Sequence, residues 1–331
     1  MQRGCRYGEF LRRASSIAVD AAAGSNRGRA RVVPELGLWP IRALALTKEV
    51  VLRPVFGYVF TLCAAVGLSV VITQLAMLTT TVYLHRHLAH HGVELRPEVR
   101  AVSRFFVWAF SGMKPRQWAQ VHRSHHAAED TANDPHSPIN FGGGRRGARY
   151  VLVHNGPLYT SATRDPHLAE KYRDLTADRW DRWFFDHGEA GVLIGVTIAC
   201  TAMGFIGHAL VGGWVGVSVG VAAGLLSAGL HFASYLLAGG VINGYGHASA
   251  IRRPGSGYAA NMPLVAWLTA GEGWHRNHHA AENSPRLGLG RQLDLGWVAI
   301  TGLRGLRLAR VTARGAAGLE RLRRLSAPSP S

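Results

Sequence analysis

Long runs without charged residues divide this chain into apolar and polar parts. One run covers residues 54–84 and a second covers 190–251. A helix of about 20 apolar residues crosses the ~30 Å hydrocarbon core of a bilayer. The second run is long enough for two spans, with a break at Gly212-Gly213-Trp214. The first run is long for one span and short for two, so it forms either one tilted helix or a hairpin near residues 67–69, and we expect the hairpin.

This pattern predicts an all-α integral membrane protein with about four transmembrane helices and a histidine-rich helical cap on the cytosolic side. We expect a basic, disordered tail over residues 1–50, a main domain over 51–311, and a basic, disordered tail over 312–331. Two further apolar stretches, 105–113 and 261–270, are too short to span a bilayer and are expected to lie at its surface.

The charge balance fits a membrane protein. The chain has 331 residues with 37 Lys and Arg against 20 Asp and Glu, a net charge of +17. Such a charge suits either nucleic acid or anionic lipid, but a stretch of more than 60 uncharged residues makes a nucleic-acid partner improbable, so we expect none. Cys5, Cys63 and Cys200 have no disulfide or metal-binding spacing, which argues against a zinc ribbon or an iron–sulfur site.

Most of the 17 histidines fall into three short clusters. The first reads HRHLAHH from His85, the second HRSHH from His122, and the third HRNHH from His275. On a helix, positions i, i+3 and i+4 share one side, so each H-R-x-H-H box can direct three imidazoles into one volume. Two boxes and the first cluster offer more ligands than one ion needs, which predicts two metal ions. Imidazole suits iron, zinc and copper, so the pattern leaves the metal open.

The first cluster has a less regular spacing. His85 and His90 are five residues apart, about 140° around an α-helix, so they converge only if the helix end is bent or frayed. His87 and His91 are in excess of this pair. We expect them to face solvent or to support their neighbours.

Other polar residues near the clusters are candidates for orienting the imidazoles through their second nitrogen. These candidates are Glu129, Asp130, Asp134 and His136 after the second box, and Glu272 and Asp294 near the third. The alternative for the first four is a polar loop with an Asp-Pro turn, and for Asp294 a helix cap. His208 and His231 are isolated within the second apolar run, where we expect hydrogen-bonded, structural histidines.

Together, these motifs resemble the three histidine boxes of the membrane fatty acid desaturases, and most of all the acyl-CoA desaturase branch. GEGWHRNHH from Gly271 is similar to that branch's third box, and DPHSP from Asp134 resembles its DPH motif. NGYGH, with Asn243 and His247 four residues apart, resembles its N-x-x-x-H pair. The resemblance covers about residues 55–310.

The resemblance implies a non-haem di-iron centre in a cytosolic cap above four transmembrane helices. It implies these iron ligands, with Asn243 acting directly or through water: His85, His90, His122, His125, His126, Asn243, His247, His275, His278 and His279. Two Fe²⁺ ions would then be the cofactors and O2 the co-substrate. The implied reaction inserts a cis double bond into a long-chain acyl group, carried as acyl-CoA or as an acyl lipid.

Such an enzyme also needs a headgroup site and a source of electrons. Candidate headgroup-binding residues are Arg86, Lys114, Arg116 and Arg123, for which phospholipid contact or packing of the boxes is an equal alternative. The sequence has no haem-attachment motif, dinucleotide fingerprint or cysteine cluster. We therefore expect a separate electron-donor protein: a ferredoxin, a cytochrome b5-like protein or a flavin reductase.

Two other functions fit parts of the pattern. A di-iron lipid hydroxylase uses similar boxes, although the contexts of GEGWHRNHH and NGYGH favour desaturation. A membrane metal-binding or transport protein would place ionisable residues inside its spans, whereas these clusters lie at the ends of the apolar runs. We expect a multi-pass membrane enzyme with its active site on the cytoplasmic side.

Overall fold

The computed structural model describes residues 53–248 and 259–326, so the expected tail over 1–50 lies outside the described residues. The elements of the first half are α3 (Arg53–Thr79), η3 (Thr80–Ala89), β1 (Val93–Leu95), α4 (Pro97–Ser111), α5 (Pro115–Ala127), η4 (Pro138–Phe141), α6 (Gly144–Ala162), α7 (Pro166–Lys171) and η5 (Asp181–Phe185). Those of the second half are α8 (Gly188–Val211), α9 (Gly213–Tyr245), α10 (Pro263–Leu268), α11 (His275–Ala280), α12 (Leu295–Gly305), β2 (Ala309–Val311) and α13 (Ala313–Ser326).

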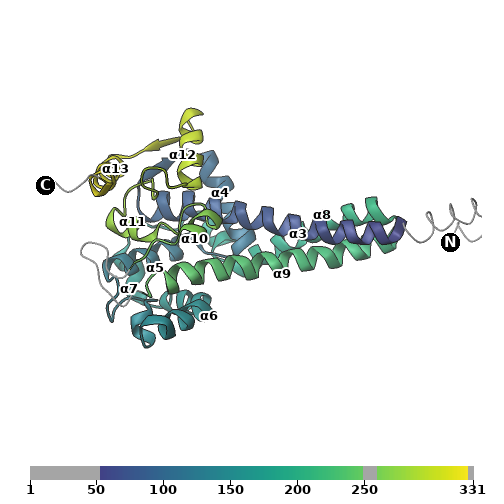
Figure 1. Cartoon of the computed structure of the whole chain (residues 1–331), viewed down its shortest axis with the longest axis horizontal. Coiled ribbons are helices and arrows are strands. Elements are labelled where there is room, and N and C mark those ends of the chain that lie inside the picture. The colour runs from purple at the N-terminus through teal and green to yellow at the C-terminus, as the bar shows by residue number, and fades with distance from the viewer. Residues whose placement is uncertain (1–52, 249–258, 327–331) are drawn as a thin grey trace, which may run out of the picture. The chain divides into compact units, whose positions relative to one another are not determined.

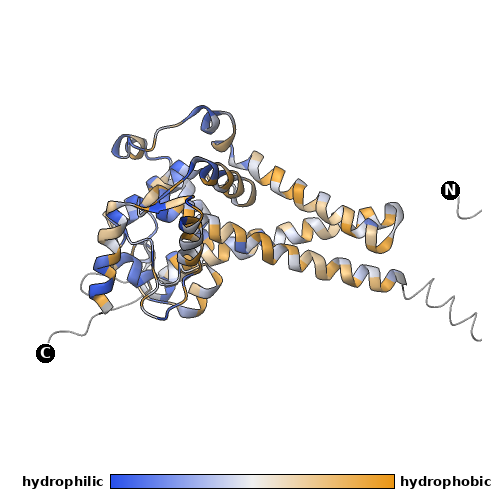
Figure 2. Cartoon of the chain, turned by 90° about the horizontal axis from the view of Figure 1, so that it is seen from above, coloured by the Kyte–Doolittle hydropathy of each residue, from blue (hydrophilic) through white to orange (hydrophobic). Residues whose placement is uncertain are grey.

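Three apolar helices form a bundle on one side of a polar cap (Figure 1). Within the described residues, three helices are long and apolar enough to cross a bilayer: Pro54–Ala89, Gly188–Val211 and Gly213–Tyr245. Figure 2 shows hydrophobic residues along the bundle and hydrophilic ones in the cap. Large apolar side chains such as Phe60 and Phe205 are exposed on the bundle, as expected for a surface that faces lipid.

Helices α8 and α9 pack at backbone contact. A Cβ atom on Gly207 would collide with the carbonyl oxygen of Gly216, and one on Gly220 with that of Met203. Small residues at such a crossing let two membrane helices approach closely. The turn between them uses Gly212 and Gly213, whose positive φ angles favour glycine, so the break lies where the sequence predicts it.

The expected hairpin in the first apolar run is wrong. The run forms a single helix, α3, which continues into the π-helix η3 without a turn. Gly67 lies inside α3, and a side chain there would meet open space. The run therefore crosses a bilayer once, which reduces the expected four spans to three among the described residues. One crossing therefore separates Arg53 from His85.

The cap departs from two further expectations. Strands β1 and β2 form a short antiparallel pair, with Val93 opposite Val311, in a chain that is otherwise helical. The expected disordered tail from residue 312 contains helix α13. Gly315, Gly318 and Leu322 recur at helical spacing and give this helix a narrow buried face that packs against the cap.

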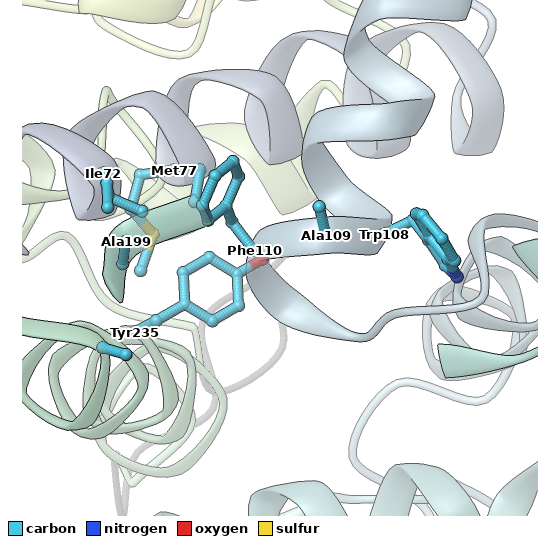
Figure 3. Close-up of a cluster of buried hydrophobic side chains, with 9 residues drawn as sticks. Ile72, Met77, Trp108, Ala109, Phe110, Ala199 and Tyr235 are labelled. Atoms are coloured by element: carbon cyan, nitrogen blue, oxygen red, sulfur yellow. The ribbon is translucent and has the colours of Figure 1, made fainter. Parts of the chain in front are cut away.

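A buried histidine joins the bundle to the cap. His231 of α9 is 1% exposed. Its Nδ1 atom lies 2.9 Å from the Thr73 hydroxyl of α3, and its Nε2 atom donates to the Phe110 carbonyl of α4 at 2.5 Å. Figure 3 shows the surrounding apolar cluster, where Met77, Phe110 and Tyr235 meet. His231 therefore has the structural role that its isolation in the sequence predicts.

Candidate metal centre

Nine histidines from distant parts of the chain converge in the cap as two adjacent groups. In each group, one nitrogen of every imidazole lies within 4.8 Å of one nitrogen of every other. The first group comprises His85, His90, His122, His126 and His278, and the second comprises His125, His247, His275 and His279. Eight of the nine are buried and His126 is partly buried. The structure thus brings together all nine of the histidines that the sequence nominates.

Each H-R-x-H-H box divides its histidines between the two groups. Box two, on α5, gives its i and i+4 residues, His122 and His126, to the first group and His125 to the second. Box three, on α11, does the reverse. It gives its i+3 residue, His278, to the first group, and its i and i+4 residues, His275 and His279, to the second. We expected each box to fill one volume. Positions i+3 and i+4 diverge by about 100° on a helix, which is enough to serve two neighbouring sites.

The π-helix η3 explains how His85 and His90 converge. Its backbone bonds join residues five apart, and the His90 N–H donates to the His85 carbonyl at 3.0 Å. Residues five apart therefore lie one above the other, and these two rings are 4.9 Å apart between centroids. The bend anticipated from the sequence is a widened helical turn, a feature that often marks functional sites.

Carboxylate oxygens lie close to the outer nitrogen of five imidazoles, and two of these pairs, His125–Asp134 and His247–Asp130, form hydrogen bonds. The Nδ1–carboxylate distances are 2.7 Å for His85–Glu272, 2.7 Å for His125–Asp134, 3.0 Å for His247–Asp130, 3.1 Å for His279–Glu129 and 3.3 Å for His126–Glu282. An Nδ1–H that points to a carboxylate leaves the Nε2 lone pair directed into the cluster, the usual arrangement of a histidine that binds metal.

The protonation states favour a bound cation. Burial lowers the pKa of seven cluster histidines, which keeps them neutral near pH 7: His90, His122, His125, His126, His275, His278 and His279. Their Nε2 atoms face one another closely, 2.9 Å apart for His90–His122 and 3.2 Å for His275–His279. Facing lone pairs repel unless a cation lies between them, so these residues fit a metal in each group. The ligand set of imidazoles without thiolate is compatible with iron, zinc or copper.

Comparison with known proteins identifies the family. The sequence model of the fatty acid desaturases matches residues 61–291. This chain belongs to the fatty acid desaturase family. The two histidine groups therefore correspond to the di-metal site that is typical of these desaturases, and the protein has desaturase-type activity on acyl chains.

Relatives of this desaturase act on different acyl carriers. A hex-5-enoyl-[acyl-carrier protein] acetylenase of Moorena producens is 30% identical over 73% of this chain and 75% of its own. An sn-1 stearoyl-lipid 9-desaturase of Synechocystis is 30% identical over 59% of this chain and 54% of its own. An acyl-CoA 5-desaturase of Anemone leveillei is 29% identical over 70% of this chain and 65% of its own. The comparisons thus establish the family, but they do not assign the chain to its acyl-CoA branch.

The supporting residues nominated from the sequence have three different roles in the structure. Asp134 and Glu272 contact cluster histidines directly. His136 instead stacks on the ring of His125, with centroids 4.5 Å apart. Asp294 has a different role. It forms an ion pair with Arg86 at 2.8 Å and accepts a hydrogen bond from the backbone N–H of Trp297 at the start of α12, as the alternative of a helix cap predicts.

The sequence contains a further signal for Glu129, which is among the candidates above, and for Glu282, which is not. Boxes two and three are followed by the same three residues, giving HRSHHAAE and HRNHHAAE. The glutamates of these copies are Glu129 and Glu282. Each binds the last histidine of the opposite box, Glu129 to His279 and Glu282 to His126. A comparison of the two boxes beyond their histidines finds both.

Asn243 occupies a different position from the histidines. It lies one helical turn before His247. Its side-chain amide donates a hydrogen bond to the side-chain oxygen of Asn155 at 2.9 Å, and it lines a cavity beside the metal centre. Its expected role as a ligand, direct or through water, stays a prediction.

Three of the four expected headgroup cations are engaged within the protein. Arg86 is 1% exposed and binds Asp294 and the Pro285 carbonyl. Arg116 binds Asp181 and Asp186, and Arg123 binds Asp174 and two backbone carbonyls. These arginines hold loops of the cap against each other. Lys114 differs from them because it lines the cavity.

This cavity has a volume of about 300 Å³ and runs beside the first histidine group. His122, His275 and Glu272 line one part of it, and Met77, Tyr235 and Leu236 line an apolar part at the top of the bundle. Trp118 and Tyr159 also line it, and the ring of Trp118 stacks on that of His122. An apolar chain in this cavity would pass close to the metal centre while excluded from water.

Proposed function

We propose that this protein is an O2-dependent acyl desaturase that introduces a cis double bond into a long-chain acyl group presented as its CoA thioester. The observation that supports this most strongly is the pair of imidazole groups beside an apolar cavity. Removal of two hydrogens from adjacent methylenes needs an oxidant far stronger than any side chain. The overall balance takes the acyl chain, O2, two electrons and two protons to the alkene and two molecules of water.

We propose that two iron ions occupy the two histidine groups. Bound iron would supply the activation of O2 that attack on an unactivated C–H bond requires. The residues around it have simpler tasks. Glu272, Asp134, Asp130, Glu129 and Glu282 keep the Nδ1–H of their histidines pointing outward. Burial of the imidazoles excludes water and keeps them neutral for metal binding.

The acyl chain is proposed to lie in the cavity, with its far end against Met77 and Leu236. Lys114 lines the same cavity and forms no ion pair with any residue that the structure describes, so it is the remaining candidate for an acidic headgroup. We place the cap on the cytoplasmic side, where acyl thioesters and soluble electron donors are available. The donor itself is proposed to be a separate protein, such as a ferredoxin or a cytochrome b5-like protein.

Lipid profiling of cells that express the protein tests this proposal. Wild type is expected to yield acyl chains that lack two hydrogens, and His126→Ala to yield none, because His126 contacts both His278 and Glu282. His91→Ala is the matched control, because His91 is 39% exposed and lies outside both groups. Equal products from wild type and His126→Ala would overturn the proposal. Products that gain one oxygen would identify a hydroxylase instead.

A further inference from the structure

Helix α13 forms a basic surface over the metal centre, beyond the part of the chain that matches the family. The match ends at residue 291, and α13 covers Ala313–Ser326. In Figure 1 and Figure 2 this helix lies at the end of the cap away from the apolar bundle. Its position directs it toward the aqueous phase rather than toward lipid.

Close packing fixes α13 against segments that carry cluster histidines. A Cβ atom on Gly315 would collide with the carbonyl oxygen of Gly92, two residues after His90. One on Gly318 would collide with the backbone of Ser284, which follows box three. The backbone contact at both points makes α13 a rigid part of the cap.

The surface beside α13 also contains the most exposed of the carboxylates next to cluster histidines. Among the five carboxylates that hold cluster histidines, Glu282 has the most exposed side chain, at 46%. The others range from 0% for Asp134 to 22% for Glu129. From Glu282 one imidazole, that of His126, leads directly to His278 in the first group.

The charges on this surface are mostly positive. Helix α13 carries Arg314, Arg321, Arg323 and Arg324 against Glu320 alone. The side chains of Arg323 and Arg324 are 78% and 79% exposed. Arg321 lies near Glu282, whose pKa is lowered chiefly by its hydrogen bond to His126 and further by this arginine. A protein with an acidic face would find complementary charge here.

We propose that the basic face of α13 is the docking site for an acidic electron-donor protein, which delivers its electrons to the metal centre over Glu282 and His126. The proposal rests on the need of the proposed function for a separate donor. Each docked donor is oxidised by one electron, so two are used per turnover, and O2 is the final acceptor. Arg314, Arg323 and Arg324 steer the donor, and Glu282 lies at the contact.

The experiment uses the full-length, iron-loaded protein in nanodiscs of zwitterionic lipid, and in a parallel series with a rising content of anionic lipid. A plant-type ferredoxin of net negative charge and its reductase form the donor system. The test variant is Arg314→Glu/Arg323→Glu/Arg324→Glu. At about 0.01 M salt, its kcat/KM for ferredoxin is expected to fall by about 10- to 100-fold. The deficit is expected to shrink near 0.1 M salt, because the screening length falls from about 30 to about 10 Å.

Two controls separate docking from other effects. Arg145→Glu/Arg146→Glu/Arg149→Glu makes the same charge change on exposed residues of α6 and is expected to keep the wild-type kcat/KM for ferredoxin. Reduction of the iron by dithionite, measured by stopped flow, is expected to be equal in all three proteins, because a small reductant needs no docking surface.

The outcomes are distinct. An unchanged kcat/KM for the α13 variant, or an equal loss in the α6 variant, would overturn the docking site. A defect that follows the content of anionic lipid rather than the concentration of ferredoxin would identify α13 as a membrane contact and would also overturn it. A wild-type protein that forms no unsaturated product with either ferredoxin or dithionite would instead count against the proposed function.

Discussion

The Nδ1 atom of His85 lies 2.7 Å from one carboxylate oxygen of Glu272, and the hydroxyl of Thr81 donates to the other. The pair joins the end of a membrane helix to the loop before box three. Burial alone would raise the pKa of Glu272, but the neighbouring His85 lowers it below its usual value. Glu272 is therefore a carboxylate at neutral pH, and it fixes His85 with Nε2 facing the first group.

Replacement of Glu272 by glutamine is expected to lower iron affinity by about 10- to 100-fold, because a neutral amide no longer holds the imidazole in one tautomer. Iron content after dialysis against a chelator measures the effect. Glu320→Gln, an exposed glutamate on α13, is the control and is expected to keep its iron. Equal iron retention in both variants would contradict the role of Glu272.

Met77→Ala is expected to shift the product profile toward longer acyl chains. Met77 lies about two turns before His85 on the same helix, and it lines both the cavity beside the metal centre and a second cavity of 370 Å³. Removal of its side chain would join the two. Gas chromatography of products from acyl chains of graded length gives the measurement.

The matched control for Met77→Ala is Val70→Ala, because Val70 lines only the second cavity. It is expected to leave the profile unchanged. Met77 is 5% exposed, so the test variant also loses stability, by roughly 2–5 kcal/mol. A profile that stays the same in a folded Met77→Ala protein would show that Met77 does not limit chain length.

His231→Leu is expected to destabilise the protein without emptying the metal centre. The change leaves the Phe110 carbonyl without its donor, whereas the Thr73 hydroxyl keeps its hydrogen bond to the Ser69 carbonyl, and we expect a cost of roughly 1–3 kcal/mol. Thermal unfolding in detergent, with iron content measured in parallel, tests this. The exposed His208 of α8 offers the control His208→Leu, which is expected to match wild type in both measurements. Loss of iron from His231→Leu would mean that His231 is more than structural.

The ion pair of Asp178 predicts a small dependence of stability on pH. Hydrogen bonds from the Arg104 guanidinium lower the pKa of Asp178 from 3.8 to about 2. A folded-state pKa below the unfolded value stabilises the protein above about pH 4, and this stabilisation is lost as the pH falls toward 2. The Asp178 side chain is 52% exposed, so the effect is about 1 kcal/mol or less.

Comparison of wild type with Asp178→Asn isolates this contribution. Thermal unfolding followed by circular dichroism is expected to show wild type more stable at pH 6, with the difference declining below about pH 4. A difference that stays constant down to pH 2 would mean that Asp178 does not titrate with a lowered pKa.

The helical period predicted which histidines gather, but not how they divide. Positions i, i+3 and i+4 placed His122, His125 and His126 on one side of α5 correctly. Their assignment to different groups depends on where α11 packs against α5, and a period along one helix contains no such information. The π-helix was likewise out of reach, because the sequence gives no separate sign of a backbone that hydrogen-bonds five residues apart.

The apolar pattern predicted the bundle more fully than it predicted the cap. It located α8, α9 and the turn at Gly212, because a lipid-facing helix must be apolar along its whole length. It misjudged the first run, since length alone cannot separate a helix that extends into the cap from a tight hairpin. It also missed α13, whose buried face consists of two glycines and one leucine and so carries little hydrophobic signal.

Each of boxes two and three contributes histidines to both groups, and this division affects how the protein acquires its metal. Each group takes nitrogens from both α5 and α11, so an ion in either group would fasten these helices at the separation that the other group requires. Uptake of the second ion is then easier than uptake of the first. We expect a sigmoidal iron titration, with molecules that hold either two ions or none and few that hold a single one.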